Sequence, residues 1–379
     1  MKNKKIRVLF VPHWYPTKQN KISGIFIERQ VESISKDCDA AVLHVEMNRK
    51  SYTSISENKG FLEVIVYKKK RRPLSLTSFI GYLEGYRIIK KYFGNFDLFH
   101  IQVLYPGSGI FVLLMSLLSK KPYIVSEHSS MYLEEDGTFK EYSSIKKSLI
   151  RIVANNAKAI IVVSNCLKEA LEKNKIKNKF YIIPNIVDFN NEEREQKGNR
   201  IKKMLHISLL KDKEKNVSGI LDALKEIYMA RQDFILGIVG DGPDRMYLEK
   251  IAKDYGFLDD VVFFHGAVEP SKVSNFISNC DFLITNSRYE TFSVSTAEAL
   301  AHGKPVISTR CGGPEEFIDE SNGILINVND KEALVSAIEY MLDNHNRYNS
   351  NLIKKIAIEK FSPEIIGKEL FEVYKEVLN

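Results

Sequence analysis

The chain has 379 residues, which corresponds to two or three domains of about 150 residues each. Its apolar fraction of 44% and its charged fraction of 27% are typical of a globular protein and exclude a disordered or fibrous chain. The longest apolar stretch, residues 109–118, is too short for a bilayer-spanning helix, which needs about 20 residues. The four cysteines are scattered without paired spacing, which excludes a disulfide framework and indicates a reducing cytoplasm.

The net charge of +7 is distributed unevenly along the chain. Residues 1–187 contain 31 lysines and arginines against 16 aspartates and glutamates, whereas the remainder contains 24 against 32. The basic part includes a run of five cations at residues 68–72. This asymmetry predicts an anionic partner for the N-terminal part, either a membrane surface or a nucleic acid. A solvated loop is the alternative interpretation of the run itself.

Short β-branched runs alternate with helical patterns through the first half of the chain. The runs predicted to be strands are residues 6–11, 40–45, 63–67, 98–103, 123–126, 159–163 and 180–183. Several are apolar on both faces, as in parallel sheets covered by helices. One of the intervening helices follows Gly24 and has Ile27, Val31 and Ile34 on one face.

The same alternation restarts in the second half, where strands are predicted at residues 204–209, 234–239, 261–264, 282–285, 305–308 and 324–326. The fold class is therefore α/β, with two doubly wound domains in tandem at residues 1–188 and 189–361. The polar stretch at 190–203 is the predicted linker. A last helix, residues 362–379, begins with Ser362 as N-cap and Pro363 at its first position. Its apolar stripe must be buried, and the N-terminal domain is one candidate partner.

The most informative stretch is residues 286–307, directly after the strand at 282–285. A helix is predicted to begin near Phe292 and Ser293, whose backbone amides would then be unsatisfied donors that bind phosphate. Glu290 precedes this turn and Glu298 lies along the helix, at the carboxyl ends of strands where open α/β sheets bind ligands. A carboxylate in that place can accept hydrogen bonds from paired sugar or ribose hydroxyls.

These two glutamates, eight residues apart and followed by Gly303-Lys304-Pro305-Val306, resemble the signature of family 4 retaining glycosyltransferases with the GT-B fold. Further segments resemble that family in the same order along the chain. They are Tyr15-Pro16, residues 23–26, Glu127-His128, Val163-Ser164, residues 183–188, Lys215-Asn216, residues 240–243, His265-Gly266, residues 312–316 and Gly323. Because the segments cover nearly the whole chain, the resemblance rests on the set and not on one motif.

The resemblance implies two Rossmann-like domains that face each other across a cleft, with the acceptor on the N-terminal domain and the nucleotide on the C-terminal one. It implies that Glu298 holds the ribose of the donor. Gly266 and Val268 would flank the nucleotide base. Gly24 would let the backbone approach the donor phosphates.

The resemblance also implies the catalytic groups. Glu290 would hold hydroxyls of the transferred sugar, and His128 would reach that sugar from the other domain. Lys215, together with the amides of Phe292 and Ser293, would stabilise the charge that develops on the leaving diphosphate. In this family, retention is ascribed to front-face attack, in which the departing phosphate oxygen accepts the proton of the acceptor.

The sequence departs from the family in the loop ahead of Lys215. The family usually has an arginine there, whereas this chain has Ser208-Leu209-Leu210. Lys211 and Lys213 are candidates to replace it, although lysine is a point charge without the bidentate fork of arginine. We predict no metal and no cofactor besides the nucleotide sugar, since three histidines of this region lack metal-ligand spacing: His206, His265 and His302.

The expected function is retaining transfer from a UDP- or GDP-sugar to a glycan or lipid-linked acceptor, in the synthesis of a bacterial lipopolysaccharide, capsule or other surface polysaccharide. A Rossmann oxidoreductase would need G-x-G-x-x-G, and Gly107-Ser108-Gly109 lacks the third glycine. A nucleotide-sugar-binding protein without catalysis and a GT-B sugar-nucleotide epimerase remain alternatives.

We expect a cytoplasmic protein in peripheral contact with the inner face of the plasma membrane. The cations at residues 68–72 would contact anionic lipid, and the apolar groups beside them would enter the headgroup region. These groups are Leu74, Leu76, Phe79, Ile80, Tyr82 and Leu83. Nucleic acid is disfavoured as a partner, because no base-stacking array or recognition motif accompanies the charge.

Overall fold

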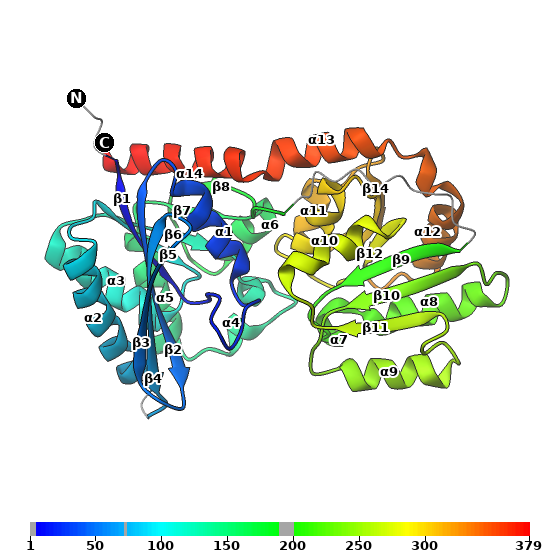
Figure 1. Cartoon of the computed structure of the whole chain (residues 1–379), viewed down its shortest axis with the longest axis horizontal. Coiled ribbons are helices and arrows are strands. Elements are labelled where there is room, and N and C mark those ends of the chain that lie inside the picture. The colour runs from blue at the N-terminus through cyan, green and yellow to red at the C-terminus, as the bar shows by residue number, and fades with distance from the viewer. Residues whose placement is uncertain (1–4, 72–73, 189–200) are drawn as a thin grey trace. The chain divides into compact units, whose positions relative to one another are not determined.

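The computed structural model describes residues 5–71, 74–188 and 201–379 (Figure 1). Contacts divide the chain into two compact units. Unit 1 combines the chain up to Ile186 with Pro363–Asn379, and unit 2 is Val187–Ser362. The domain boundary predicted after residue 188 lies two residues beyond this division. No helix in the described part of the chain is long and apolar enough to cross a membrane.

Unit 1 is built on an eight-stranded sheet with the order β3-β4-β2-β1-β5-β6-β7-β8. The strands are β1 (Arg7–Pro12), β2 (Asp39–Asn48), β3 (Tyr52–Asn58), β4 (Phe61–Lys69), β5 (Leu98–Gln102), β6 (Tyr123–Glu127), β7 (Ile160–Val162) and β8 (Phe180–Ile182). Neighbouring strands are parallel except for β3 and β4, which form an antiparallel hairpin. The sequence did not predict β3, because this edge strand is mostly exposed and polar.

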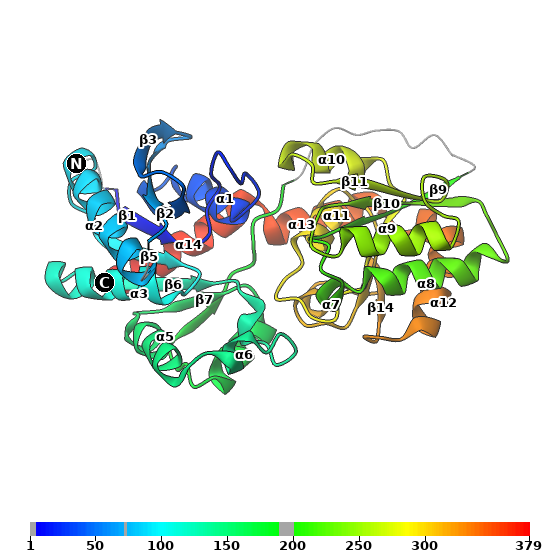
Figure 2. The ribbon, with the colours of Figure 1, turned by 90° about the horizontal axis from the view of Figure 1, so that it is seen from below.

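Helices cover both faces of this sheet. They are α1 (Ile25–Ile34), α2 (Leu74–Tyr92), α3 (Pro106–Ser119), α4 (Thr138–Glu141), α5 (Ser144–Asn156), α6 (Asn165–Lys173) and α14 (Pro363–Leu378). The core beside α1 and α14 contains Ala40 and Val42 of β2, whereas Gly85 of α2 lies against Leu43. Successive side chains of a strand point to opposite faces, so α2 covers the face opposite to α1 and α14 (Figure 2). Helix α3 packs between α2 and α5.

The last helix, α14, belongs to unit 1 and packs against α1. Its stripe residues Ile366, Leu370 and Tyr374 are fully buried. The Tyr374 hydroxyl is 2.7 Å from Nδ1 of His100 on the central strand β5, so a polar contact accompanies the apolar packing.

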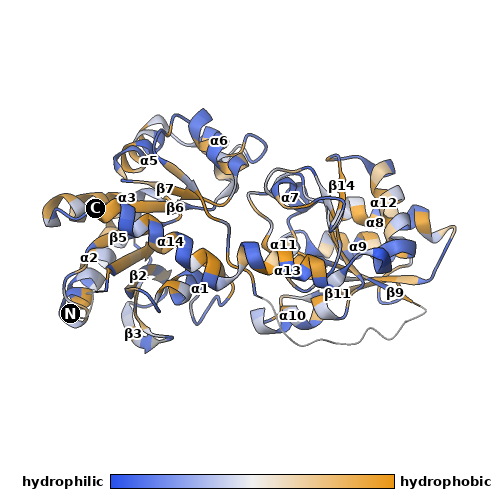
Figure 3. Cartoon of the chain, turned by 90° about the horizontal axis from the view of Figure 1, so that it is seen from above, coloured by the Kyte–Doolittle hydropathy of each residue, from blue (hydrophilic) through white to orange (hydrophobic). Residues whose placement is uncertain are grey.

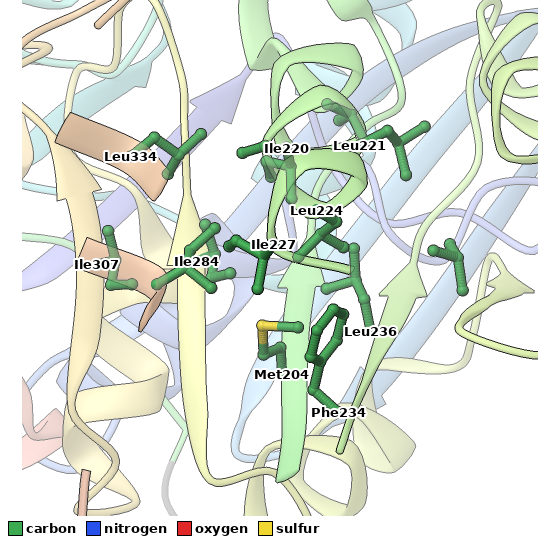
Figure 4. Packing of buried hydrophobic residues seen from close by; sticks show 14 of the residues in the cluster. Met204, Ile220, Leu221, Leu224, Ile227, Phe234, Leu236, Ile284, Ile307 and Leu334 are labelled. Carbon is green, nitrogen blue, oxygen red and sulfur yellow. The ribbon is translucent and has the colours of Figure 1, made fainter. Parts of the chain in front are cut away.

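Unit 2 contains a six-stranded parallel sheet with the order β11-β10-β9-β12-β13-β14. The strands are β9 (Lys202–Ile207), β10 (Phe234–Val239), β11 (Val262–Gly266), β12 (Phe282–Thr285), β13 (Val306–Thr309) and β14 (Gly323–Ile326). The helices are α7 (Asp212–Lys215), α8 (Val217–Tyr228), α9 (Arg245–Asp254), α10 (Pro270–Ser278), α11 (Val294–Ala301), α12 (Lys331–Asn344) and α13 (Ser350–Phe361). Figure 4 shows the core under α8, where Leu224 and Ile227 lie over Met204 of β9.

Most of the predicted linker at residues 190–203 lies outside the described residues. Its last two residues contradict the prediction, since Lys202 and Lys203 pair with Phe234 and Ile235 as the first residues of β9. Backbone pairing to β10 overrides the polar character of these two side chains.

The strand order places one crevice in each unit. In unit 2 the chain runs outward from β9 through β10 to β11, then returns to β12 on the other side of β9. In unit 1 the same reversal occurs between β1 and β5. Loops diverge at such a switch point, which is where open α/β sheets bind ligands.

Candidate functional site

The switch point of unit 2 holds an ion pair between two residues that are far apart in sequence. Lys215 follows β9 and Glu290 follows β12, and the lysine Nζ lies 2.6 Å from the glutamate Oε1. The same oxygen accepts a 2.8 Å hydrogen bond from the hydroxyl of Ser287. The two charged side chains are only 17% and 14% exposed, so water screens their attraction weakly. The structure therefore brings together two of the predicted catalytic residues.

The positive charge at this point comes from Lys215. Burial opposes the charged form of Lys215, but the facing Glu290 carboxylate outweighs it and raises the pKa of the lysine. His206 lies beneath the pair on β9, with Nδ1 2.9 Å from the carbonyl oxygen of Ile284. Burial lowers the pKa of His206 to about 4, so this ring is neutral at pH 7.

The backbone around Glu290 is fixed from both sides. Its amide donates to the carbonyl oxygen of Cys311 at 2.8 Å, and its own carbonyl accepts from the amide of Gly313 at 3.0 Å. A Cβ on Gly313 would lie 2.3 Å from the carbonyl oxygen of Thr291, so this close approach requires glycine. The carboxylate is thus held on a braced loop that joins β12 to α11.

Helix α11 begins at Val294, one residue after the predicted phosphate-binding turn. Ser293 has a positive φ of 68°, and its hydroxyl is 2.7 Å from that of Thr296. The ring of Phe292 is buried against Phe317 and Phe361, with centroids 5.3 and 5.4 Å away, which fixes the entry to the helix. Glu298, the predicted ribose ligand, lies within α11 and is 8% exposed.

Arg288 positions the lysine loop, a role that the sequence analysis missed. Its guanidinium donates to the Asp212 carbonyl at 2.7 Å and to Oδ1 of Asn216 at 2.8 Å. Its Nε donates to Oδ1 of Asn329 at 3.0 Å. One side chain thus ties the β12–α11 loop to both sides of Lys215. In the sequence, only its position between Asn286 and Glu290 could have indicated this role.

Two glycines with positive φ shape the loops after β10 and β11 at this edge of the sheet. A Cβ on Gly240, whose φ is 133°, would lie 1.8 Å from the carbonyl oxygen of Ser208. The loop that departs from the family pattern is therefore packed backbone to backbone against the loop after β10. Gly266, with φ 70°, ends β11, and Val268 follows it half-buried.

The two candidates for the missing arginine lie on the short helix that ends at Lys215 and at its N-cap. Lys211 forms an ion pair with Glu214, and Lys213 is exposed. Whether either lysine replaces the arginine stays a prediction.

The predicted histidine of unit 1, His128, is held by amide side chains. Its Nε2 is 3.0 Å from Oε1 of Gln102, whose Nε2 donates to Gln30 at 3.0 Å. Because an amide oxygen only accepts, Nε2 carries the proton. Burial lowers the pKa of His128 to about 3, although a hydrogen bond with Asn185 opposes this, so the ring is neutral.

Glu127 has a positioning role beside His128. Its carboxylate accepts hydrogen bonds from the backbone amides of Leu104, His128 and Ser129 at 2.8–2.9 Å. Burial raises the pKa of Glu127 to about 7, against the effect of these three amides. The residue therefore joins the loops after β5 and β6 and fixes the backbone of His128.

Gly24 ends the loop before α1 with a positive φ of 71°. A Cβ there would lie 2.6 Å from the backbone carbonyl of Trp14. Glycine is required here because the backbone of Trp14 lies so close. The contact with donor phosphates that was predicted for Gly24 is not needed to explain this glycine.

A cavity of about 660 Å³ lies at the switch point of unit 1 and includes residues that the sequence analysis did not single out. The His13 and Tyr105 rings stack in it with centroids 4.0 Å apart, and Lys146 lies 5.0 Å from the Tyr105 ring. His44 and Glu46 form a 3.2 Å contact in its wall. Burial, reinforced by the nearby His44, lowers the pKa of His13 to about 4. Aromatic faces with flanking polar groups are suited to binding sugars. In the sequence, the aromatic residues that closely follow predicted strands could have indicated this cavity.

Among the residues with described positions, no three His, Cys, Asp or Glu side chains are grouped so that they could hold a metal ion. Metal independence of the chemistry stays a prediction.

Comparison with known proteins covers nearly the whole chain. Residues 5–191 match the family model "Glycosyltransferase Family 4", and residues 188–357 match "Glycosyl transferases group 1". An uncharacterised glycosyltransferase of Methanocaldococcus jannaschii is 28% identical, over 98% of this chain and 99% of its own. The alpha-monoglucosyldiacylglycerol synthase of Streptococcus pneumoniae is 23% identical, over 79% of this chain and 70% of its own. The crystal structure of Anabaena HepE in complex with UDP superposes with a TM-score of 0.75 at 17% identity, covering 98% of this chain and all of that one.

Proposed function

The chain belongs to the family 4 glycosyltransferases, and from this premise we propose that it transfers a sugar, with retention, from a nucleoside diphosphate sugar to a glycan or lipid-linked acceptor. The predicted family and the GT-B fold are confirmed by these matches. The donor, the stereochemistry and the acceptor class are the proposed parts. The bound UDP of the Anabaena structure supports a nucleotide donor.

The observation that carries the proposal is the ion pair of Lys215 and Glu290 at the switch point of unit 2. A donor that enters this crevice offers sugar hydroxyls to the Glu290 carboxylate and phosphate oxygens to the Lys215 ammonium. Lysine has three N–H donors, so it can hold the carboxylate and a phosphate together. The amides at the start of α11 add a second attraction for the phosphate.

This arrangement assists the chemical step through charge. The bond between the anomeric carbon and the diphosphate breaks, and negative charge develops on the leaving oxygen. Lys215 and the start of α11 stabilise that charge. The leaving oxygen then accepts the proton of the acceptor hydroxyl, so the step needs no separate general base. His128 is neutral, and its contact with the transferred sugar stays a prediction from the family resemblance.

The acceptor belongs in the cavity of unit 1, where the stacked His13 and Tyr105 offer an apolar face and Lys146 a positive charge. We place the protein in the cytoplasm, at the inner face of the plasma membrane, in bacterial surface polysaccharide synthesis. A glycolipid-forming relative, the alpha-monoglucosyldiacylglycerol synthase, supports a lipid-linked acceptor.

Two substitutions test the donor site. Glu290→Gln removes the sugar contact, so turnover should fall about 10²- to 10³-fold while affinity for the free nucleoside diphosphate changes little. Glu298→Ala removes the ribose contact, so that affinity should fall. The donor is first identified by thermal stabilisation with a panel of nucleotide sugars, which adds about 2.7 kcal/mol at 100 times the dissociation constant. Equal loss of nucleotide affinity in both variants would contradict the assignment.

Acceptor-dependent release of nucleoside diphosphate distinguishes a transferase from a binding protein or an epimerase. The release should persist in EDTA, because Lys215 and helix-end amides supply the positive charge. Activity that is lost in EDTA and restored by Mg²⁺ or Mn²⁺ would show that a metal is required.

A further inference from the structure

Helix α3 lies on the surface of unit 1 although no residue from Pro106 to Ser119 is charged. A helix that is hydrophobic all round is normally buried in a core or a membrane. Here Leu114, Leu117 and Leu118 are 40%, 67% and 78% exposed. Figure 3 shows the hydrophobic colour along the second half of this helix.

The helices on either side of α3 extend this apolar surface. Leu76 and Ile80 of α2 are four residues apart, and Ile145 and Ile152 of α5 are seven apart, so each pair lies on one side of its helix. All four side chains are at least 42% exposed. We call the outer surface of these three neighbouring helices the α2–α3–α5 face. An exposed apolar surface of this kind marks an interaction site.

The charge of this face is almost entirely positive. Helices α2 and α5 carry Arg87, Lys90, Lys91, Lys146, Lys147 and Arg151, and Lys120 and Lys121 follow α3. The only acidic residue of the three helices is Glu84, which binds Lys68 of β4 at 2.9 Å. Lys121 pairs with Asp97 at 3.7 Å, and the other cations stand beside exposed leucines. This combination complements a bilayer with anionic headgroups.

We propose that the α2–α3–α5 face docks on an anionic lipid bilayer, with the α3 leucines in the headgroup region. This inference rests on the proposed function, because it brings the acceptor cavity to a lipid-linked acceptor. Ser78 of α2 and Ile145 and Lys146 of α5 line that cavity, so the helices that contact the bilayer also line the acceptor site.

The docking surface differs from the one predicted around residues 68–72. Lys68 is neutralised by Glu84, and Tyr82 is 3% exposed because its ring stacks on Phe111, with centroids 5.2 Å apart. Arg72 and the side chain of Leu74 lie outside the described residues. Only Leu76 and Ile80 of the predicted group, each exposed, belong to the new face. The helix periodicity of α2 turns Tyr82 inward and these two residues outward.

Charge also argues against a second copy of the chain as the occupant. Two α2–α3–α5 faces brought together would oppose cations to cations, because Glu84 and Asp97 already pair with Lys68 and Lys121 of the same unit. An anionic bilayer removes this repulsion, and each cation near its surface strengthens binding.

Co-sedimentation of the full chain with vesicles tests the proposal. Vesicles of phosphatidylcholine alone are compared with vesicles that also contain phosphatidylglycerol, at low and high salt. We expect binding only to the anionic vesicles, and weaker binding at high salt. The double variant Leu117→Ser with Leu118→Ser should bind at least about tenfold more weakly. Lys90→Gln with Lys120→Gln should bind about fivefold more weakly per lysine.

Matched controls come from exposed positions in unit 2. Met229 and Met246 are 87% and 83% exposed, so Met229→Ser with Met246→Ser removes a comparable apolar area away from the face. Lys250→Gln with Lys355→Gln removes two exposed cations. Both control variants should bind vesicles like the unchanged protein, and thermal melting checks that every variant is folded.

Binding that ignores lipid charge, or that survives in the leucine variant, would overturn the proposal. A dimer that dissociates in the leucine variant, without vesicle binding, would assign the face to a second copy instead. Failure of the proposed function has a different signature. In that case no nucleotide sugar stabilises the protein, whereas vesicle binding persists.

Discussion

Arg288 fixes the geometry of the loop around Lys215 from a neighbouring loop of unit 2. Its planar fork holds a carbonyl on one side of Lys215 and an amide oxygen on the other. Lysine cannot reproduce two such bonds. We therefore expect Arg288→Lys to lower kcat about 10- to 100-fold, because Lys215 loses its fixed position. The affinity for nucleoside diphosphate should change less than kcat.

Arg231→Lys is the matched control for this prediction. Arg231 also uses its fork on two partners, Asp233 and Asp343, but both lie away from the switch point. Steady-state kinetics and thermal melting of both variants separate positioning from stability. A kcat of Arg288→Lys that equals that of Arg231→Lys would contradict the positioning role.

At the residue scale, the sequence was sufficient for groups that belong to a recognisable local pattern. Glu290, Glu298 and Lys215 were selected by resemblance, and the structure places Glu290 and Lys215 in contact. Arg288 was not found, because its partners lie more than 40 residues away and no local pattern indicates them. The ion pair of Lys68 was not found for the same reason, since its partner Glu84 comes from the next helix.

At the scale of elements, α14 depends on a single buried polar contact as well as on packing. Tyr374→Phe removes the hydroxyl and leaves Nδ1 of His100 without that 2.7 Å contact. We expect the free energy of unfolding to fall by about 1–3 kcal/mol, which is the usual cost of an unsatisfied buried polar group. Tyr340→Phe on α12 is the control, because this ring is 48% exposed and should change the stability little. Urea denaturation of both variants measures the difference.

The elements themselves could be predicted largely from hydrophobic runs, because parallel strands buried on both faces are apolar throughout. All thirteen predicted strands appear, with shifts of one or two residues at most ends. The missed β3 has an exposed polar face and only β4 as a neighbour, so its conformation comes from tertiary pairing. The apolar character of α3 was visible in the sequence, but its exposure depends on which helices flank it.

For the whole molecule, the buried histidines predict acid sensitivity. His13, His100, His128 and His206 have a pKa of about 3 or 4 in the folded chain, mainly because of burial, against 6.5 when unfolded. The unfolded chain therefore binds more protons below pH 6.5, so stability is full above that pH and falls as the pH drops. Each histidine contributes about 1.4 kcal/mol per pH unit in that window.

Glu127 acts in the opposite direction, since its raised pKa of about 7 favours the folded chain at low pH and loses that contribution as the pH rises from 4.5. Unit 1 holds His13, His100 and His128, and unit 2 holds His206 and the partly buried His265, whose pKa burial also lowers. We therefore expect unit 1 to lose more stability than unit 2 between pH 7 and pH 5. Hydrogen exchange measured peptide by peptide at both pH values checks this. Equal loss in the two units would contradict it.

The division of the chain has a consequence for synthesis on the ribosome. Unit 2 is complete once Ser362 has left the exit tunnel, whereas unit 1 lacks α14 until residues 363–379 have also emerged. Until then the surface that Ile366 and Leu370 later cover stays open to solvent. We expect the second unit encoded to be the first one finished, so a nascent chain would expose apolar surface on its N-terminal part until residues 363–379 have emerged.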